Sequence, residues 1–258
     1  MTGKDDLTKA TQLGSTIGAY LPDGAYHMKE MGINDGIRHS GKADVIDKWP
    51  EPHEAYGYYL RNNTVPLENG TSITAWDAHY ACMKGLTGTG SNCDGTSYPE
   101  DMYEDNWVGA NALKLLRRMP KAKDGEAKQP WFMHVSFPGP HPPFLVTGKM
   151  ADSVANRTWP QPVDSEKPHT CINDKSPGEP ENGNKAIGSR CNYGAEIENL
   201  DRLFGLVLAE VEARGETDNT LVCVRWGARM LPVSHVPHLC SPLLLGFLIQ
   251  LRSWRDAW

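Results

Sequence analysis

The sequence of 258 residues lacks a long apolar segment, an excess of positive charge and a paired-cysteine metal motif. Its longest apolar run, residues 243–251, is far shorter than the roughly 20 residues that a membrane-spanning helix needs. The formal net charge is -6 and the basic residues are scattered, which argues against a nucleic-acid-binding surface. Because no Cys-x-x-Cys pair occurs among the six cysteines, a structural zinc site is not expected either. We therefore predict no membrane span and no nucleic-acid partner.

The cysteines and the Asn-x-Ser/Thr sequons point instead towards the secretory route. Cys82 and Cys93 flank one polar loop and Cys171 and Cys191 flank another, so each pair is a candidate disulfide. Three sequons in loop-like sequence begin at Asn62, Asn69 and Asn156. We predict a glycoprotein that is lysosomal or extracellular if a missing N-terminus carries a signal peptide. The polar start of the printed chain does not resemble such a peptide, so a cytosolic location stays open.

The chain is organised around residues 131–144, which read Trp-Phe-Met-His-Val-Ser-Phe-Pro-Gly-Pro-His-Pro-Pro-Phe. The first half is aromatic and β-branched and predicts a buried strand over 131–137. The prolines that follow lack an N–H and fix φ, so the strand must end there. His141 then lies in a stiff loop at the carboxyl end of a strand, where ligands bind in α/β folds. An imidazole there suits acid–base chemistry or an anionic substrate, whereas a proline-rich turn with an exposed histidine is the plainer interpretation.

Two helix-then-strand units predict an α/β fold with a central sheet, flanking helices and long loops. Residues 107–118 have a helical apolar pattern, with Asp105-Asn106 as the expected N-cap and Pro120 as the stop. Residues 193–213 form the clearest amphipathic helix, and a short buried strand over 220–224 follows. The charged residues of the second helix are expected to face water: Glu196, Glu198, Arg202, Glu210 and Glu212.

The other segments have weaker patterns. Residues 1–60 look irregular apart from a short helix over 28–37, and residues 61–100 look loop-rich apart from a helix over 73–82. Residues 145–190 read as a polar surface excursion with little regular structure. After Val224 the pattern ends, and residues 225–230 fit neither a periodic element nor a turn. We therefore expect one domain over 1–224 and an aberrant or deleted continuation over 225–258.

Three segments, in this order, resemble the sulfatase family of the alkaline-phosphatase-like superfamily. Gly3-Lys4-Asp5-Asp6 looks like the Gly-Lys segment that follows the family's nucleophile region. Residues 130–144 are similar to the family strand that ends in His-x-Pro-Phe. Residues 192–224, with Ile-Glu-Asn-Leu-Asp-Arg-Leu-Phe-Gly and Gly-Glu-Thr-Asp-Asn-Thr-Leu-Val, resemble the helix and strand before the metal loop. The resemblance implies a partial alkaline-phosphatase-like sandwich, incomplete at both ends.

The resemblance also implies hydrolysis of small-molecule or carbohydrate sulfate esters. In the family a formylglycine, made from the first residue of a Cys/Ser-x-Pro-Ser-Arg motif, attacks sulfur, and a Ca²⁺ or Mg²⁺ ion holds the sulfate. By position, Lys4 matches the lysine that contacts the sulfate and the nucleophile. His141 matches the histidine that contacts the ester near the leaving-group oxygen. Asp6 stands where many members have a histidine, so a proton-transfer role for it is in doubt.

The sequence departs from the family where the chemistry is concentrated. It contains no Cys/Ser-x-Pro-Ser-Arg motif, and Arg225-Trp226-Gly227 stands where an Asp-His/Asn-Gly metal loop is expected. Without the nucleophile and metal ligands, we predict no appreciable sulfatase activity for the chain as written. Three alternatives stay open: a phosphodiester or phosphonate hydrolase of the same superfamily, a non-catalytic protein that keeps an anion-binding remnant at Lys4 and His141, and an unstable product without function.

Overall fold

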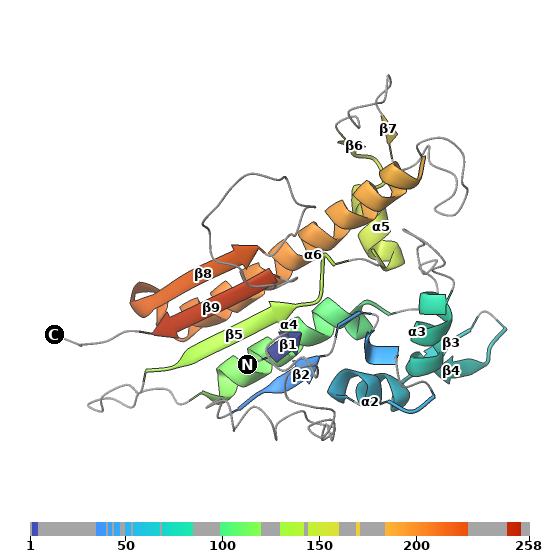
Figure 1. Cartoon of the computed structure of the whole chain (residues 1–258). Coiled ribbons are helices and arrows are strands. Elements are labelled where there is room, and N and C mark those ends of the chain that lie inside the picture. Colours follow the sequence, from blue (N-terminus) through green and yellow to red (C-terminus); the bar gives the residue numbers. More distant parts are fainter. Residues whose placement is uncertain are drawn as a thin grey trace, which may run out of the picture.

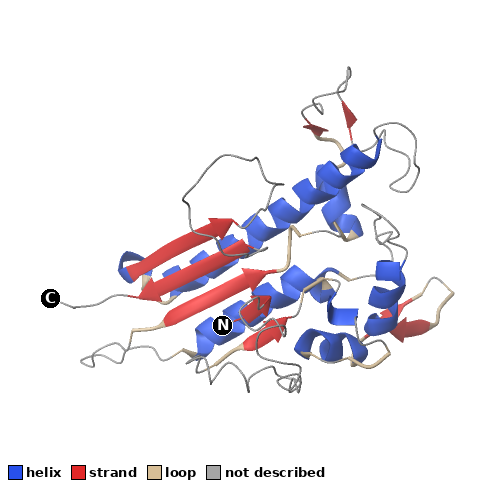
Figure 2. Ribbon diagram, viewed as in Figure 1, coloured by secondary structure: helices blue, strands red, loops and turns tan. Residues whose placement is uncertain are grey.

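The computed structural model places one central sheet with helices packed beside it (Figures 1 and 2). It describes residues 2–4, 35–39, 41–42, 44–46, 50–52, 54–67, 69–84, 99–119, 130–141, 144–159, 169–170, 184–226 and 247–253. The five-stranded sheet has the order β2-β1-β5-β9-β8. Its strands are β1 (Thr2–Lys4), β2 (Ile37–His39), β5 (Phe132–Phe137), β8 (Thr220–Trp226) and β9 (Phe247–Ser253).

The strand directions divide this sheet into two parts. Strand β1 runs parallel to both β2 and β5, with Thr2 opposite Val135 and Gly3 opposite Ser136. Strand β9 runs antiparallel to both β5 and β8. Because β1, β2 and β5 point the same way, their carboxyl ends lie at one edge of the sheet. This edge is the place where an α/β fold positions ligand-binding loops.

Helices pack on one face of the sheet, and two short hairpins lie beyond its carboxyl edge, apart from its strands (Figure 2). Helix α4 packs against β1, β5 and the longest helix, α6, while α5 packs against α6. The helices are α2 (Ala55–Arg61), α3 (Ala75–Lys84), α4 (Glu104–Arg118), α5 (Gly148–Val154) and α6 (Asn184–Ala213). Short 3₁₀ helices are η2 (Asp44–Ile46), η3 (Glu100–Met102) and η5 (Thr217–Asn219). The hairpins pair β3 (Thr64–Pro66) with β4 (Ser72–Thr74) and β6 (Thr158–Trp159) with β7 (His169–Thr170).

The core forms where α4, α6 and β5 meet. On each helix, the buried side chains are three or four positions apart, and on β5 they are every second one. This is the burial pattern of an amphipathic helix packed on a strand. The buried side chains there are Val108, Ala112, Leu115 and Leu116 of α4, Leu200, Leu203, Val207 and Val211 of α6, and Met133, Val135 and Phe137 of β5. Helices α4 and α6 approach closely at Gly109, where an added Cβ would lie 2.7 Å from Cδ2 of Leu203.

Several sequence predictions are confirmed and others need correction. The α/β class is confirmed, and β5, α6 and β8 lie where strands and a helix were predicted, although α6 begins nine residues early, at Asn184. Residues 1–60 are less irregular than predicted because β2 and α2 lie there, and α5 interrupts the expected excursion over 145–190. Ile73 and Thr74 belong to β4 rather than to a helix. Ile37 also lies in a strand, while residues 28–34 of that expected helix lie outside the described residues.

The capping prediction for α4 was wrong. The N-cap is Tyr103, whose side chain makes no capping hydrogen bond, and Asp105 lies inside the first turn instead. An aspartate in a first turn still suits the positive end of the helix dipole. Asp105 is fully buried, however, which shows that it serves a contact other than the cap.

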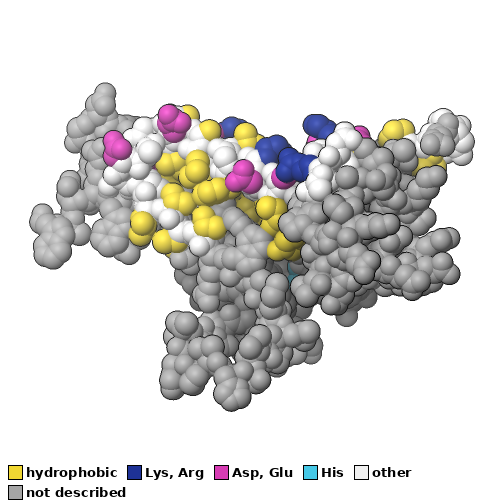
Figure 3. Space-filling view, turned by 90° about the horizontal axis from the view of Figure 1, so that it is seen from above, with side chains coloured by type: hydrophobic (Ala, Val, Ile, Leu, Met, Phe, Trp, Pro, Cys, Tyr) yellow, Lys and Arg dark blue, Asp and Glu magenta, His cyan; other side chains and the backbone are white. Residues whose placement is uncertain are grey.

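The outer strand β8 is less buried than its apolar sequence predicted. Leu221 is 55% exposed and Val224 is 46% exposed, and Phe132 at the start of β5 is 59% exposed. Figure 3 looks onto the molecule from the side of β8 and α6 and shows hydrophobic side chains at the surface among acidic and basic ones. Cys223 is a free, exposed thiol, whereas Cys191 is disulfide-bonded. Of the helices that the structure describes, none could cross a membrane.

Candidate functional site

The carboxyl ends of β1, β2 and β5 bring three segments to one edge of the sheet. Lys4 is the last residue of β1, and the turn from Pro138 to His141 follows the neighbouring strand β5. Gly41 and Lys42 follow β2 on the other side of β1. The backbones of Lys4 and His141 therefore lie at the same edge. The side chain of Lys4 and the whole of Asp6 lie outside the described residues, so their roles stay predictions.

The turn after β5 is tied to helix α4. The backbone N–H of His141 donates to the carbonyl of Pro138 at 3.2 Å, which closes the turn on itself. The N–H of Gly139 donates to Oδ1 of Asp105 at 3.0 Å. The Gly139–Pro140 peptide bond is cis. His141 itself is half-buried, so its imidazole stands at the boundary between the protein and solvent.

A buried ionic cluster lies beside this turn and joins three elements. Nζ of Lys42 lies 2.6 Å from Oε1 of Glu196 on α6 and 3.7 Å from Oε1 of Glu104 on α4. Oε2 of Glu104 lies 3.9 Å from Nε2 of His39, the last residue of β2. All of these side chains are at most 2% exposed. Glu196 was expected to face water, and this expectation was wrong because α6 turns it into the interior towards Lys42.

The side chains of the cluster are removed from water, and their pKa values reflect this burial. Burial raises the pKa of Glu196 to about 8, against the opposing attraction of Lys42. Burial also raises the pKa of Glu104 well above its ordinary value, and neither of its carboxyl oxygens has a hydrogen-bond partner among the described residues. Burial alone would lower the pKa of Lys42, but Glu196 and Glu104 more than offset this and raise it. Both carboxyl groups therefore hold their protons more tightly than an exposed glutamate does, and Nζ of Lys42 donates a hydrogen bond to Glu196.

Two histidines complete the polar surroundings. The N–H of Gly41 donates to Nδ1 of His39 at 2.9 Å, so the proton of neutral His39 lies on Nε2, on the side of Glu104. Burial lowers the pKa of His79 to about 4, although a backbone hydrogen bond to Lys42 opposes this shift. His79 is therefore neutral at physiological pH.

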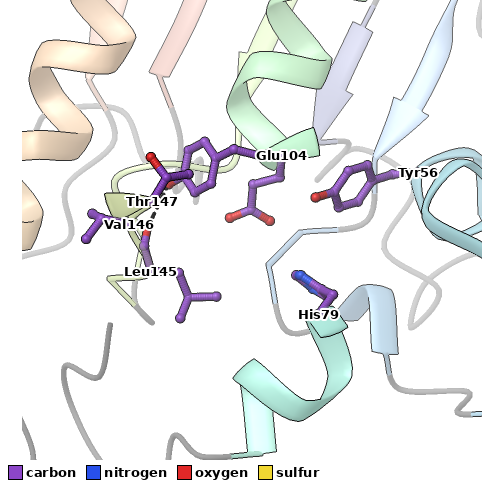
Figure 4. A pocket seen from close by; sticks show the side chains of 7 residues that line it. Tyr56, His79, Glu104, Leu145, Val146 and Thr147 are labelled. Carbon is purple, nitrogen blue, oxygen red and sulfur yellow. Dashed lines mark hydrogen bonds between the residues drawn. The ribbon is translucent and has the colours of Figure 1, made fainter. Parts of the chain in front are cut away.

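A small cavity opens beside Glu104 (Figure 4). The carboxyl group of Glu104 points into it from α4, Tyr56 and His79 line one side, and residues 145–147 line the other. The space open to the centre of a water molecule is only ≈ 10 Å³. Such a volume holds about one water molecule. The cavity is thus too small for a sulfate ester, and the half-buried turn at His141 is the better location for a substrate.

The described residues do not fit the Ca²⁺ or Mg²⁺ ion that the resemblance implies. Such ions need several oxygen ligands directed at one point. In the described part of the chain, no group of three His, Cys, Asp or Glu side chains could hold a metal ion. The buried carboxyl groups of Glu196 and Asp105 are already engaged by Lys42 and by the N–H of Gly139. We derive no catalytic step through a metal from these residues.

Sequence reasoning overlooked the buried cluster, although one signal pointed to it. Gly41-Lys42 repeats the Gly-Lys pair of Gly3-Lys4, and in both pairs an aspartate stands two residues after the lysine. Gly3-Lys4 ends β1, whereas Gly41-Lys42 follows β2. The carboxyl partners had no local signal. Glu196 is separated from Lys42 by 154 positions along the chain.

Comparison with known proteins assigns the chain to a family. A family model of sulfatases matches residues 28–225, which is more than half of the chain. The chain belongs to the sulfatase family. This chain is also 24% identical over 225 residues to a choline-sulfatase of Rhizobium meliloti (strain 1021). That alignment covers 78% of this chain but only 41% of the choline-sulfatase. No solved structure matches the chain.

The matched range bears on the two Gly-Lys pairs. Lys42 and His141 lie inside residues 28–225, and Lys4 and Asp6 lie outside. The sulfatase assignment thus covers the turn after β5 and the loop after β2, while the predicted roles of Lys4, Asp6 and His141 remain to be tested. The predicted boundary at Val224 remains a prediction as well.

Proposed function

We propose that this sulfatase-family protein binds sulfate esters at the carboxyl edge of the sheet, against His141 and a lysine, without hydrolysing them. The parallel pairing of β1 with β2 and β5 carries this proposal, because it gathers the loops of Lys4, Lys42 and His141 at one edge. A sulfate group is a small anion, and lysine and histidine side chains at the rim of a sheet can donate hydrogen bonds to its oxygens.

Two lysines, Lys4 and Lys42, are candidates for the contact with sulfate. Lys42 lies within the range matched by the family. Its Nζ is, however, 2.6 Å from Glu196, so its charge is balanced inside the protein. Lys4 ends the strand next to β5 and is closer in register to the turn of His141. Substitution of each lysine separately decides between them.

The proposed absence of turnover rests on the printed sequence. The Cys/Ser-x-Pro-Ser-Arg motif from which the family makes its nucleophile is missing. Loss of an attacking group removes the covalent route, whereas the groups that bind the ester are retained. When bound in complete family members, the Ca²⁺ or Mg²⁺ ion offsets the charge on the sulfuryl oxygens.

Binding is tested by isothermal titration with inorganic sulfate, choline sulfate and an aryl sulfate. Choline sulfate is included because the matched relative is a choline-sulfatase. We expect His141→Ala to weaken binding by about tenfold, equivalent to about 1.4 kcal/mol. Lys4→Ala and Lys42→Met identify the lysine, and Lys114→Ala on the exposed side of α4 is the control. Equal affinity of the wild-type and His141→Ala proteins would exclude the proposed site.

Turnover is tested separately with an aryl sulfate and Ca²⁺. We expect the wild-type protein to release no more product than His141→Ala does. Robust hydrolysis would show that the chain is a sulfuric ester hydrolase with a nucleophile outside the expected motif. Hydrolysis of an aryl phosphodiester or phosphonate instead would assign it to the other chemistry of the superfamily.

We also propose that the protein follows the secretory route. The disulfide at Cys191 supports this, since disulfides persist in oxidising compartments. The sequon asparagines Asn62, Asn69 and Asn156 lie on the surface, Asn62 and Asn69 in exposed turns. A mobility shift of protein from secreting cells after removal of N-linked glycans would support this proposal. Accumulation of an unglycosylated, reduced protein in the cytosol would contradict it.

A further inference from the structure

The turn that carries His141 can be held in place by very few hydrogen bonds. In the stretch Pro138-Gly139-Pro140-His141-Pro142-Pro143, only Gly139 and His141 have a backbone N–H. The N–H of His141 is used inside the turn, where it donates to the carbonyl of Pro138. Gly139 therefore provides the one backbone N–H of this stretch that bonds to another element, and its acceptor is Oδ1 of Asp105 at 3.0 Å.

The carboxyl group of Asp105 also fits the turn by shape. A Cβ added at Gly139 would lie 2.4 Å from Oδ2 and 3.2 Å from Cγ of Asp105. A contact as short as 2.4 Å does not occur between non-bonded atoms, so the carboxyl group occupies the space that a side chain at position 139 would need. Asp105 is completely buried, and helix α4 fixes its backbone. The turn thus rests on a rigid support two residues before His141.

We propose that Asp105 is a positioning residue, which orients the imidazole of His141 towards a sulfate ester by holding Gly139 from beneath. The proposal depends on the proposed function for the identity of the ligand, but its geometric part stands on the contacts of Asp105 alone. A carboxylate suits the role because a charged acceptor binds a backbone N–H more strongly than a neutral one. The positive charge of Lys42 also acts on Asp105 and opposes the rise of its pKa that burial causes.

The experiment follows the imidazole of His141 by NMR in protein with isotope-labelled histidine. The His141→Asn protein assigns the signal by its loss. The free protein is recorded first, and inorganic sulfate is then added. In the wild-type protein we expect one sharp His141 signal that shifts in a saturable way with sulfate. In Asp105→Ala we expect a displaced or multiple His141 signal in the free protein and an about tenfold weaker response to sulfate.

Three variants separate positioning from general damage. Asp105→Asn keeps an acceptor oxygen of similar shape, so we expect it to restore the single His141 signal and most of the sulfate affinity. Gly139→Ala disturbs the same contact from the other side without changing α4, and we expect it to reproduce the effect of Asp105→Ala. Asn106→Ala is the control, since Asn106 bonds to Glu100 and Arg202 rather than to the turn. All variants are compared at equal folded fraction, measured by thermal unfolding.

The outcomes distinguish this inference from the proposed function. If Asp105→Ala and Gly139→Ala both leave the free His141 signal unchanged, Asp105 does not position the imidazole and the inference is wrong. If Asn106→Ala has the same effect as Asp105→Ala, the change is general and the inference is also wrong. If sulfate does not move His141 in the wild-type protein while the Asp105 variants still displace its signal, the ligand assignment fails and Asp105 still sets the orientation.

Discussion

The two halves of helix α6 bury different chemistry. From Cys191 to Leu200 the buried face includes Asn192 and Glu196, which contact loops at the carboxyl edge of the sheet, and Asn199, which accepts a hydrogen bond from Arg202 of the same helix. Nδ2 of Asn192 donates to the carbonyl of Phe144 at 2.9 Å, and Glu196 pairs with Lys42. From Leu203 to Val211 the buried face is apolar and packs against α4.

The polar part of α6 supports the loops of the proposed site, and the apolar part supports the core of the fold. Apolar contacts are non-directional and tolerate small shifts of their partners, whereas a short ion pair or hydrogen bond fixes specific atoms. The first half of α6 thus positions the loops near the proposed site at the cost of buried charge. The second half supplies hydrophobic burial to the core.

The largest expected effect lies in the polar half. At about pH 9, above the pKa of Glu196, Lys42→Met should lower the free energy of unfolding by about 3–5 kcal/mol, because it leaves the carboxylate of Glu196 buried without its partner. Urea unfolding followed by circular dichroism measures this loss. Lys149→Met is the control, since Lys149 is exposed and pairs with Glu100 at the surface, where such pairs contribute about 0–1 kcal/mol. Equal losses in the two variants would show that the cluster does not stabilise the fold.

In the apolar half, Leu203→Ala should cost about 2–5 kcal/mol because it opens a cavity between α6 and α4. Gly109→Ala should also destabilise the wild-type protein, since the new Cβ would press on Leu203. In the Leu203→Ala protein that clash disappears, and alanine is the better helix former by roughly 1 kcal/mol. A double-mutant cycle by urea unfolding tests this reversal. Additive losses would contradict the close approach of the two helices.

The polar half should also make stability depend on pH. The pKa of Glu196 rises from 4.5 to about 8 on folding, so its stabilising proton is lost as the pH increases towards 8. The pKa of His79 falls from 6.5 to about 4, which stabilises the protein as the pH rises to 6.5. Between pH 6.5 and 8 only the carboxyl effect remains, and stability should fall by up to about 1.4 kcal/mol per pH unit for each proton.

The matched variant for this pH dependence is Glu104→Gln. Glu104 also has a raised pKa in the folded protein and releases its proton on unfolding, whereas an amide has no such proton, so the decline above pH 6.5 should become shallower. Urea unfolding at a series of pH values provides the slope. An unchanged slope in the variant would place the titrating group elsewhere.

The smallest effect is expected on the outer side of the apolar half. Leu206 is 43% exposed, so Leu206→Gln should change the free energy of unfolding by less than about 0.5 kcal/mol. The difference between the unfolding free energies of Leu206→Gln and Leu203→Ala then shows how strongly stability depends on burial at two positions three residues apart. A loss as large as that of Leu203→Ala would indicate that a partner covers Leu206.

The sequence was sufficient for elements whose signals are local. The aromatic and β-branched run predicted β5, and the apolar stripe from Leu200 to Val211 predicted α6, because both patterns repeat within one element. The position of β9 between β5 and β8 was not predicted, since strand pairing depends on segments far apart in the chain. The exposure of Leu221 and Val224 was missed for the same reason: their strand lies outermost in the described sheet.

The site was predicted in part, because the sequence indicates local structure but not which distant residues come into contact. His141 was found because prolines around it force a strand to end. Glu196 was assigned to solvent because a charged residue on a helix usually faces water, and nothing near it in the sequence names Lys42 as its partner. Asp105 was taken for a cap because aspartate is common there, whereas its acceptor oxygen serves a glycine 34 positions later.

The contact between Gly139 and Asp105 restricts which amino-acid substitutions the protein can tolerate at position 139. Every other amino acid carries a Cβ, so any substitution at position 139 introduces an atom that the neighbouring carboxyl group already excludes. A library randomised at that codon should therefore return glycine wherever aspartate is kept at 105. Tolerance should reappear when both codons vary together and a smaller residue is allowed in the helix.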